Sequence, residues 1–174
     1  MNIVVGITGG IAAYKAPELV RLLVKAGHEV RCAATAHALQ FTTRATLETV
    51  SKHPLYCDLF ASGGTEHISL KDWGDILVVA PATANIIGKA AAGIADDMLT
   101  TVLTAFINKP VIICPAMNTN MYLNPVTQRN IETLKDLGFT FVEPREAMLA
   151  CGDLGKGALA SNEIILSAVD EFLK

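Results

Sequence analysis

Four short segments of the chain contain residue types that could bind a ligand. The segment CPAMNTNMY (114–122) follows a run of β-branched residues, yet it carries two asparagines, two methionines and a tyrosine instead of the Gly, Ser and Asp of an ordinary turn. We therefore predict that this loop contacts a ligand. The other three segments combine small residues with hydroxyl or amide groups, and they are TGGIA (8–12), TAHA (35–38) and PATAN (81–85).

The glycine pair Gly9 and Gly10 is suited to a phosphate. It stands where a helix is expected to begin, and the free N–H groups and dipole of a helix start attract anions; a plain tight turn is the alternative. The pattern is not G-x-G-x-x-G, and Thr35 and His37 occupy the region where a dinucleotide site needs Asp or Glu. The residues favour a mononucleotide over NAD, with Thr35 as a second phosphate donor and PATAN facing the rest of the ligand.

These segments must be positioned by alternating strands and helices. Continuous apolar runs predict strands at 2–7, 29–34, 75–80, 110–114 and 139–143. Helical spacing and end signals predict a helix from residue 12 to Gly27, two helices within 83–106 broken near Gly93, one from Pro125 to Gly138, and one at 161–173. The alternation indicates an α/β fold, a doubly wound parallel sheet in three layers. Ligands bind such sheets beyond the carboxyl ends of the strands, where the four segments stand.

Composition limits the classes of partner. The 174 residues are expected to form one domain, and because 51% are hydrophobic and only 18% are charged, we expect apolar surface to be covered in an oligomer. A net charge of -3 without a Lys/Arg cluster argues against nucleic acid or an anionic membrane surface. The chain start lacks the pattern of a secretory signal and no apolar stretch is long enough to span a membrane, so we expect a cytoplasmic protein.

The four cysteines, at 32, 57, 114 and 151, lack metal-ligand spacing. No C-x-x-C pair or nearby histidine pair accompanies them, so we predict free thiols, no disulfide framework and no metal site. Cys32 and Cys114 stand in apolar strand-like runs, where a small buried side chain is the expected role. His28, His37 and His53 lack a functional context and are interpreted as structural.

Six segments, taken in order, resemble the homo-oligomeric flavin-containing Cys decarboxylases. They are GITGGIAAYKAPELVRLL, EHISL, PATAN, GIADDMLTTV, PAMNTNMY and ACGDLGKGALA, and they cover nearly the whole chain. The P-x-M-N-x-x-M-aromatic loop followed by Ala-Cys-Gly-Asp is most similar to the branch that acts on 4'-phospho-N-pantothenoylcysteine in coenzyme A synthesis. The resemblance implies a Rossmann-like (flavodoxin-like) sheet, FMN as cofactor, and a trimer or a dodecamer of trimers with FMN near the subunit interface.

The resemblance also implies roles for individual residues. It identifies His67 as the active-site histidine, Asn118 as the residue that holds the substrate carboxylate, and Cys151 as the thiol that completes the reaction. The implied FMN contacts are Gly9, Gly10, Thr35, Phe41, Ala82, Thr83, Ala84, Asn85 and Ala116. The implied substrate contacts are Asn118, Met121 and Ala150. Met117 and Met121 have a spacing that also suits simple core filling.

The implied reaction needs an electron sink next to the carboxylate. Flavin would oxidise the CH2–SH unit to a thioaldehyde, CO2 would leave, and the resulting enethiolate would be re-reduced and protonated to 4'-phosphopantetheine. An imidazole titrates near neutral pH, which suits His67 to acid–base work. The amide of Asn118 would orient the carboxylate. Glycines at 152, 155 and 157 suggest that Cys151 lies on a mobile lid rather than on a core strand.

Two positions depart from the family pattern, and three other functions compete. Many bacterial relatives have arginine at Ala158 and asparagine at Asp97, and many are fused to a ligase, so a separate phosphopantothenoylcysteine ligase is a further candidate partner.

A lantibiotic-type peptidyl-cysteine decarboxylase is expected to lack the Ala-Cys-Gly segment at 150–152, and a flavin prenyltransferase to lack the Asn-Met loop. A non-catalytic regulatory flavoprotein is disfavoured because His67, Asn118 and Cys151 occur together.

Overall fold

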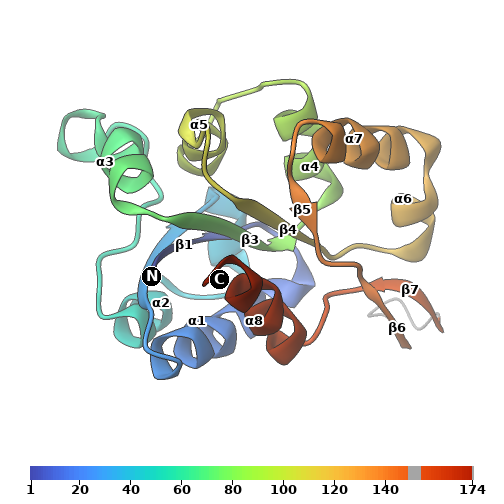
Figure 1. The fold of residues 1–174 in the computed structure, drawn as a ribbon, viewed down its shortest axis with the longest axis horizontal. Coiled ribbons are helices and arrows are strands. Elements are labelled where there is room, and N and C mark those ends of the chain that lie inside the picture. Colours follow the sequence, from blue (N-terminus) through green and yellow to red (C-terminus); the bar gives the residue numbers. More distant parts are fainter. Residues whose placement is uncertain (149–153, 174) are drawn as a thin grey trace.

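A parallel sheet of five strands forms the centre of the molecule (Figure 1). The computed structural model describes residues 1–148 and 154–173. The strands are β1 (Asn2–Ile7), β2 (Glu29–Ala34), β3 (Ile76–Ala82), β4 (Val111–Pro115) and β5 (Thr140–Phe141). Their order is β2-β1-β3-β4-β5, so the direction of winding reverses between β1 and β3. This is the flavodoxin-like order, and the predicted doubly wound fold is confirmed.

Helices cover both faces of this sheet (Figure 1). One face carries α1 (Ala16–Lys25), α2 (Arg44–Ser51) and α8 (Asn162–Asp170). The other face carries α3 (Glu66–Trp73), α4 (Ala84–Ala91), α5 (Met98–Ala105) and α7 (Pro125–Asp136), while the short α6 (Thr119–Leu123) follows β4. Single 3-10 turns lie at Ile11–Lys15, Ala36–Gln40, Ala61–Gly63 and Glu171–Leu173. Within the described ranges, no helix combines the length and apolarity needed to cross a membrane.

The two faces of the sheet create two hydrophobic cores. Side chains of a strand alternate between faces, so Ile3 and Val5 pack with α1 and α8, whereas Val4 packs with α3 and α5. Gly6 brings α5 close, because a Cβ at this position would lie 2.6 Å from a methyl group of Leu99. Burial on both faces explains why the strands are apolar along their whole length.

The predicted strands match closely, and the differences lie at their ends. The first two strands have the predicted bounds, the third begins at Ile76 and continues to Ala82, and the predicted fifth strand at 139–143 shortens to Thr140–Phe141. The strand β5 is short because it pairs with β4 only through Thr140 and Phe141. The short helices α2 and α3 were not predicted, because each buries few apolar side chains.

The predicted helix boundaries are confirmed at the positions where capping residues, glycine or proline indicated them. Asn124 Oδ1 accepts a hydrogen bond from the Val126 N–H at 2.9 Å, and α7 begins at Pro125. The break between α4 and α5 contains Gly93 with φ +68°. The helix predicted from residue 12 begins as a 3-10 turn and becomes α-helical at Ala16, so that Pro17 stands in the first turn.

An antiparallel hairpin lies outside the central sheet. It pairs β6 (Arg145–Met148) with β7 (Leu154–Ala158). The predicted functional positions Ala150 and Cys151 lie outside the described residues. Among the other cysteines, Cys32, Cys57 and Cys114 are free thiols, as predicted, and burial raises the pKa of Cys32 to about 12. The thiol of Cys32 is therefore protonated at neutral pH and serves as a core side chain.

Candidate functional site

Hydrogen bonds between strand ends bring three of the four segments together. Thr8 Oγ1, just after β1, donates to the Pro81 carbonyl at 2.7 Å and accepts from the Thr83 N–H at 3.2 Å. The Ala116 N–H after β4 donates to the Ala82 carbonyl at 2.9 Å. The glycine turn (Gly9 and Gly10), PATAN and the loop around Asn118 therefore meet at the carboxyl edge of the sheet, as the sequence predicts.

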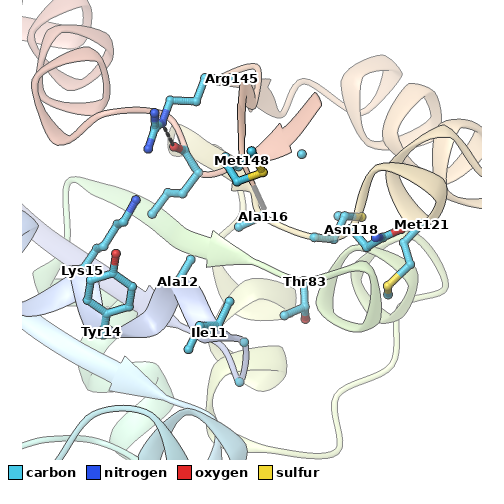
Figure 2. A pocket seen from close by; sticks show the side chains of 16 residues that line it. Ile11, Ala12, Tyr14, Lys15, Thr83, Ala116, Asn118, Met121, Arg145 and Met148 are labelled. Carbon is cyan, nitrogen blue, oxygen red and sulfur yellow. Dashed lines mark hydrogen bonds between the residues drawn. The ribbon is translucent and has the colours of Figure 1, made fainter. Parts of the chain in front are cut away.

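A first cavity of about 600 Å³ opens at this edge (Figure 2). Its walls include Gly9 and Gly10 from the glycine turn, Thr83 from PATAN, and Asn118 and Met121 from the segment after β4. The glycine turn and Asn118 thus share one cavity within a single chain. The predicted FMN contact Ala116 also lines it.

Cationic and apolar side chains complete the first cavity. Lys15 and Tyr14 come from the 3-10 turn after the glycine turn, and Arg145 and Met148 come from β6. Figure 2 shows Lys15 and Arg145 on one side of the cavity and Asn118 on the other. The cavity therefore offers hydrogen-bond donors at two separate ends with apolar walls between them, a typical arrangement for a small-molecule site.

A second cavity of about 510 Å³ adjoins the first. Its walls include Thr35 after β2, with Ala84 and Asn85 from PATAN. The two cavities meet because three residues line both of them, namely Gly9, Thr83 and Met121. Five of the predicted FMN contacts, at 9, 35, 83, 84 and 85, therefore surround one volume beside the cavity that contains Asn118.

Threonine hydroxyls in the second cavity can donate to a ligand. Thr35 Oγ1 accepts the Ala38 N–H at 3.3 Å, and Thr83 Oγ1 accepts the Ile86 N–H at 3.4 Å. Because each oxygen already accepts a backbone hydrogen bond at a helix start, its hydroxyl proton remains to be donated. Together with the amide of Asn85, this donor set fits a ligand that carries phosphate and hydroxyl groups, such as a mononucleotide.

The one lysine lining the second cavity, in the described part of the chain, is neutralised by an aspartate. Lys89 Nζ lies 2.7 and 2.8 Å from the two carboxylate oxygens of Asp96. This hydrogen bond lowers the pKa of Asp96, so the carboxylate is charged at neutral pH. Asp97, one of the two family departures, lines the same cavity and caps α5 by accepting the Thr100 N–H at 2.8 Å.

The loop around Asn118 is held by the hairpin. Asn118 Oδ1 accepts the Asn120 N–H at 2.8 Å and so caps α6, and the Met117 N–H donates to the Gly157 carbonyl at 2.9 Å. A Cβ at Gly157 would overlap the Met117 carbonyl oxygen, and one at Gly155 would overlap Thr119 Oγ1. Glycine at both positions therefore lets β7 lie directly against this loop.

A buried tyrosine joins the same two parts of the chain. The Tyr122 hydroxyl donates to Glu143 Oε2 at 2.8 Å, and Lys156 Nζ donates to the same oxygen at 2.8 Å. The bond from Lys156 is the main cause that lowers the pKa of Glu143, while burial and this carboxylate raise the pKa of Tyr122. The carboxylate is therefore charged and the phenol neutral at pH 7, which is the state the hydrogen bonds require.

Three of the predicted residues that the structure describes line neither cavity of a single chain. His67 lies on α3 and is half-buried, and its Nδ1 atom is buried without a hydrogen-bond partner among the residues described. Phe41 is exposed beside the 3-10 turn that follows β2. The predicted contact Ala82 is fully buried. Ala150 and Cys151 are outside the described ranges.

The two methionines after β4 have different surroundings. Met117 packs against the core on the α4 and α7 side, which agrees with core filling, and it also lines the first cavity. Met121 is half-exposed and lines both cavities, so it is placed to contact a ligand, as the resemblance implies.

Sequence reasoning missed three residues at the site. Lys15 and Arg145 line the first cavity and His37, interpreted as structural, lines the second. The position of His37 two residues after the end of β2 was a usable signal, because ligands bind at strand ends. Nothing comparable marks Lys15 and Arg145, which are 130 positions apart in the printed sequence and meet only in the folded chain.

The whole chain matches a known family and named relatives. A family model described as Flavoprotein matches residues 1–174. The coenzyme A biosynthesis bifunctional protein CoaBC of Bacillus subtilis is 46% identical over 173 residues, which cover 98% of this chain and 42% of that protein. The probable phosphopantothenoylcysteine decarboxylase of Streptococcus mutans is 40% identical over 176 residues, covering 99% of this chain and 98% of that protein. The chain thus spans about two fifths of the bifunctional relative and nearly all of the other.

Solved structures share the same fold. A cysteine-to-serine variant of PPC decarboxylase, complexed with pantothenoylaminoethenethiol, has a TM-score of 0.91 and 35% identity, covering 99% of this chain and 97% of that chain. A structure described as an FMN binding protein has a TM-score of 0.87 and 36% identity, covering 98% of this chain and 95% of that chain. The likeness extends over the strand ends and loops that form the two cavities.

Proposed function

This chain belongs to the Flavoprotein family, and we propose that it decarboxylates 4'-phospho-N-pantothenoylcysteine to 4'-phosphopantetheine in coenzyme A biosynthesis, with FMN as cofactor. The observation that carries the proposal is the pair of adjoining cavities. Gly9, Thr83 and Met121 connect a cavity rich in hydroxyl donors to the cavity that contains Asn118. The name of the Streptococcus mutans relative, which matches almost end to end, supports the choice of substrate.

The second cavity and the glycine turn would hold FMN. Thr35, Thr83 and Asn85 present hydroxyl and amide donors that suit its phosphate and ribityl groups. Bound there, FMN would supply the two-electron acceptor that a cysteine derivative needs before its carboxylate can leave. The contact between the cavities at Thr83 and Met121 would bring cofactor and substrate together.

Asn118 would bind and orient the substrate carboxylate. Its Oδ1 atom is directed to the backbone of α6, so the Nδ2 amide is the donor of this side chain. A hydrogen bond to a charged group contributes roughly 1.5–3 kcal/mol, enough to favour one orientation of the departing CO2. The proposal that the Cys151 thiol protonates the final intermediate, with Ala150 touching the substrate, rests on the family resemblance.

Identical chains would complete the site. His67 lines neither cavity in one chain, so its acid–base role requires that another copy bring it to a substrate. Apolar side chains around the first cavity support assembly, because Ile11, Tyr14 and Met148 are 58%, 60% and 69% exposed. We propose a trimer or a dodecamer of trimers, located in the cytoplasm, that receives its substrate from a ligase on a separate chain.

Mixing impaired variants tests the shared site. His67→Asn and Asn118→Asp proteins are each expected to lose most of their activity, and mixed oligomers formed after reversible dissociation should regain part of it. Mixtures that regain no activity, while sedimentation shows that subunits have exchanged, would place His67 outside the neighbouring site.

Turnover distinguishes the proposed function from its competitors. Purified protein with FMN is expected to release CO2 from 4'-phospho-N-pantothenoylcysteine and to form 4'-phosphopantetheine, measured by mass spectrometry. A peptide with a C-terminal cysteine should be a poor substrate. The reverse preference would identify a peptidyl-cysteine decarboxylase, and FMN binding without turnover of either compound would favour a regulatory flavoprotein.

A further inference from the structure

Two cationic side chains face each other at one end of the first cavity. Figure 2 shows the ammonium of Lys15 and the guanidinium of Arg145 directed toward one another, across the cavity from Asn118 and Met121. Lys15 comes from the turn after β1 and Arg145 from β6, so the fold brings two distant segments together at this point. The cavity has one end with an amide donor and another end with two positive charges.

The described part of the chain offers this pair no ion-pair partner. No carboxylate among residues 1–148 and 154–173 lies within ion-pair distance of Lys15 or Arg145. Arg145 Nε donates to the carbonyl of the buried Leu159 at 3.1 Å, and the Lys15 ammonium lies 5.7 Å from the centroid of the Tyr14 ring. The Nε bond holds the guanidinium in place and leaves its two terminal nitrogens for a ligand.

An arginine and a lysine in this arrangement suit a phosphate monoester. The planar guanidinium can bind two oxygens of one phosphate, and the ammonium adds a compact second charge. A phosphate monoester carries about -1.5 to -2 charges at pH 7, so it matches two cations better than a single carboxylate does.

We propose that Lys15 and Arg145 form the subsite for the phosphate of the substrate, at the opposite end of the cavity from the carboxylate site at Asn118. This inference rests on the proposed function. It names the residues by which the protein would prefer phosphorylated over unphosphorylated substrate. A substrate with an anion at each end needs donors at both ends of one cavity, and Asn118 and the Lys15–Arg145 pair provide them.

FMN also carries a phosphate, and the two cavities differ in the groups that could bind a phosphate. The second cavity has the Thr35 and Thr83 hydroxyl protons available, and its lysine is paired with Asp96. The two cations that have no ion-pair partner within residues 1–148 and 154–173 line the cavity that contains Asn118. The arrangement therefore assigns the cation pair to the substrate phosphate and the hydroxyl donors to the flavin.

The test compares substrates that differ only in the phosphate. Wild-type protein, Lys15→Met, Arg145→Met and Arg145→Lys are assayed with FMN on phosphorylated and unphosphorylated N-pantothenoylcysteine. Each Met variant should lose roughly ten- to a hundredfold in kcat/KM for the phosphorylated compound, as expected for a charged hydrogen bond, and change less than about twofold for the other. The kcat/KM of Arg145→Lys for the phosphorylated compound should lie between those of wild type and Arg145→Met. Lysine keeps the positive charge but cannot bind two phosphate oxygens at once as the guanidinium does.

Two matched controls and a binding measurement accompany the assay. Lys25→Met on α1 and Arg129→Met on α7 remove exposed cations that line neither cavity, and neither should change the preference. Calorimetry should show that wild-type protein binds 4'-phosphopantetheine more tightly than pantetheine and that the Met variants bind both alike. FMN should remain preferred over riboflavin in every variant.

The outcomes separate the subsite from the proposed function. Wild-type protein that turns over neither compound contradicts both. Wild-type turnover combined with equal losses on both compounds in the Met variants contradicts only the subsite. Variants that keep the preference for phosphorylated substrate but lose the preference for FMN over riboflavin would reassign Lys15 and Arg145 to the flavin phosphate, and so overturn the inference.

Discussion

In the second cavity the Lys89 ammonium lies 2.7 Å from an oxygen of Asp96, whereas in the first cavity Lys15 and Arg145 have no ion-pair partner within the described ranges. A paired lysine is already satisfied and adds little net charge, so recognition in the second cavity depends on neutral donors such as Thr35. The first cavity keeps its positive charge for a ligand. Under this proposal, two adjoining sites at one sheet edge would bind two phosphorylated molecules without competing for the same groups.

The two cavities also differ in how they are built. The second is made of loops that follow β1, β2 and β3 directly, and Thr35 and Thr83 cap the turns there. The first needs β6, which supplies Arg145 and Met148, and β7, whose glycines contact the loop around Asn118. Changes in the hairpin should therefore affect the first cavity and leave the second intact, and this separation can be tested.

The largest expected effect is the loss of the amide donor in the first cavity. Asn118→Asp keeps the acceptor that caps α6 but replaces the donor by a carboxylate that repels the substrate carboxylate. Loss of a hydrogen bond to a charged group lowers turnover roughly 10- to 100-fold, and the repulsion adds to this. Single-turnover CO2 release measures the loss, while flavin absorbance should show that FMN stays bound.

Asn124→Asp is the matched control for that variant. Asn124 also caps a helix through its Oδ1 atom, but it lines neither cavity. Its turnover should stay within about twofold of wild type. Near-normal turnover of Asn118→Asp would remove Asn118 from carboxylate binding and break the contrast between the two cavities.

A methyl group in the hairpin should weaken the first cavity selectively. In Gly157→Ala the new Cβ would overlap the Met117 carbonyl oxygen and force β7 away from the loop around Asn118. Overpacking of this kind typically costs about 1–3 kcal/mol, so we expect affinity for 4'-phosphopantetheine to fall about tenfold while FMN affinity is unchanged. Calorimetry with each ligand measures both affinities.

Gly88→Ala provides the comparison for the glycine change. Gly88 lies within α4, where an added Cβ would have only an ordinary contact with Asn130, so this variant should keep both affinities. Equal weakening of FMN and product binding in Gly157→Ala would mean that the cavities are not structurally independent.

The central sheet could be predicted from the sequence because its strands are buried on both faces. Val4 and Val5 are neighbours in the sequence and each lies in one of the two cores, so the strand appears in the sequence as an unbroken apolar run with clear ends. The residues that follow each strand were therefore found correctly, and Gly9, Thr83 and Asn118 lie together as predicted. The strand order itself came from the family resemblance.

The hairpin and its cations could not be predicted in this way. Its strands contain exposed charges, such as Glu146, and glycines whose role is to approach Thr119 and Met117 closely. The spacing of apolar side chains cannot predict a strand whose main contacts are made by its backbone. Arg145 becomes part of the site only because β6 places it near Lys15, and that proximity is a tertiary property.

Removing the Thr35 hydroxyl should weaken ligand binding in the second cavity. Thr35→Val removes one cap and one ligand donor, whereas Thr43→Val removes a similar cap, to the Thr46 N–H, outside both cavities. Each should cost about 1 kcal/mol of stability in thermal unfolding. Thr35→Val alone should bind FMN roughly tenfold more weakly, as measured by fluorescence titration. Similar FMN affinity in both variants would exclude Thr35 as a donor.

The smallest expected effect concerns the carboxylate that holds the hairpin. Lys156 and Tyr122 lower the pKa of Glu143 in the folded protein, so the folded chain binds a proton less readily than the unfolded chain. The resulting stability is complete above the unfolded pKa, about 4.3, and is lost as pH falls through the folded pKa. Glu143 is half-exposed, so Glu143→Gln should reduce the free energy of unfolding at pH 7 by only about 0–1 kcal/mol.

Urea unfolding at pH 7 and at pH 3.5 measures this difference, with Glu146→Gln in β6 as the control. The gap between wild type and Glu143→Gln should shrink at the lower pH, because pH 3.5 lies below the unfolded pKa of this carboxyl and folding with the charged bond to Lys156 then requires the loss of a proton. Affinity for 4'-phosphopantetheine should follow the same trend while FMN affinity does not, since Glu143 lies beside the loop of the first cavity. A gap that is the same at both values of pH would mean that the carboxylate charge does not hold the hairpin, and the glycine contacts at 155 and 157 would then be sufficient.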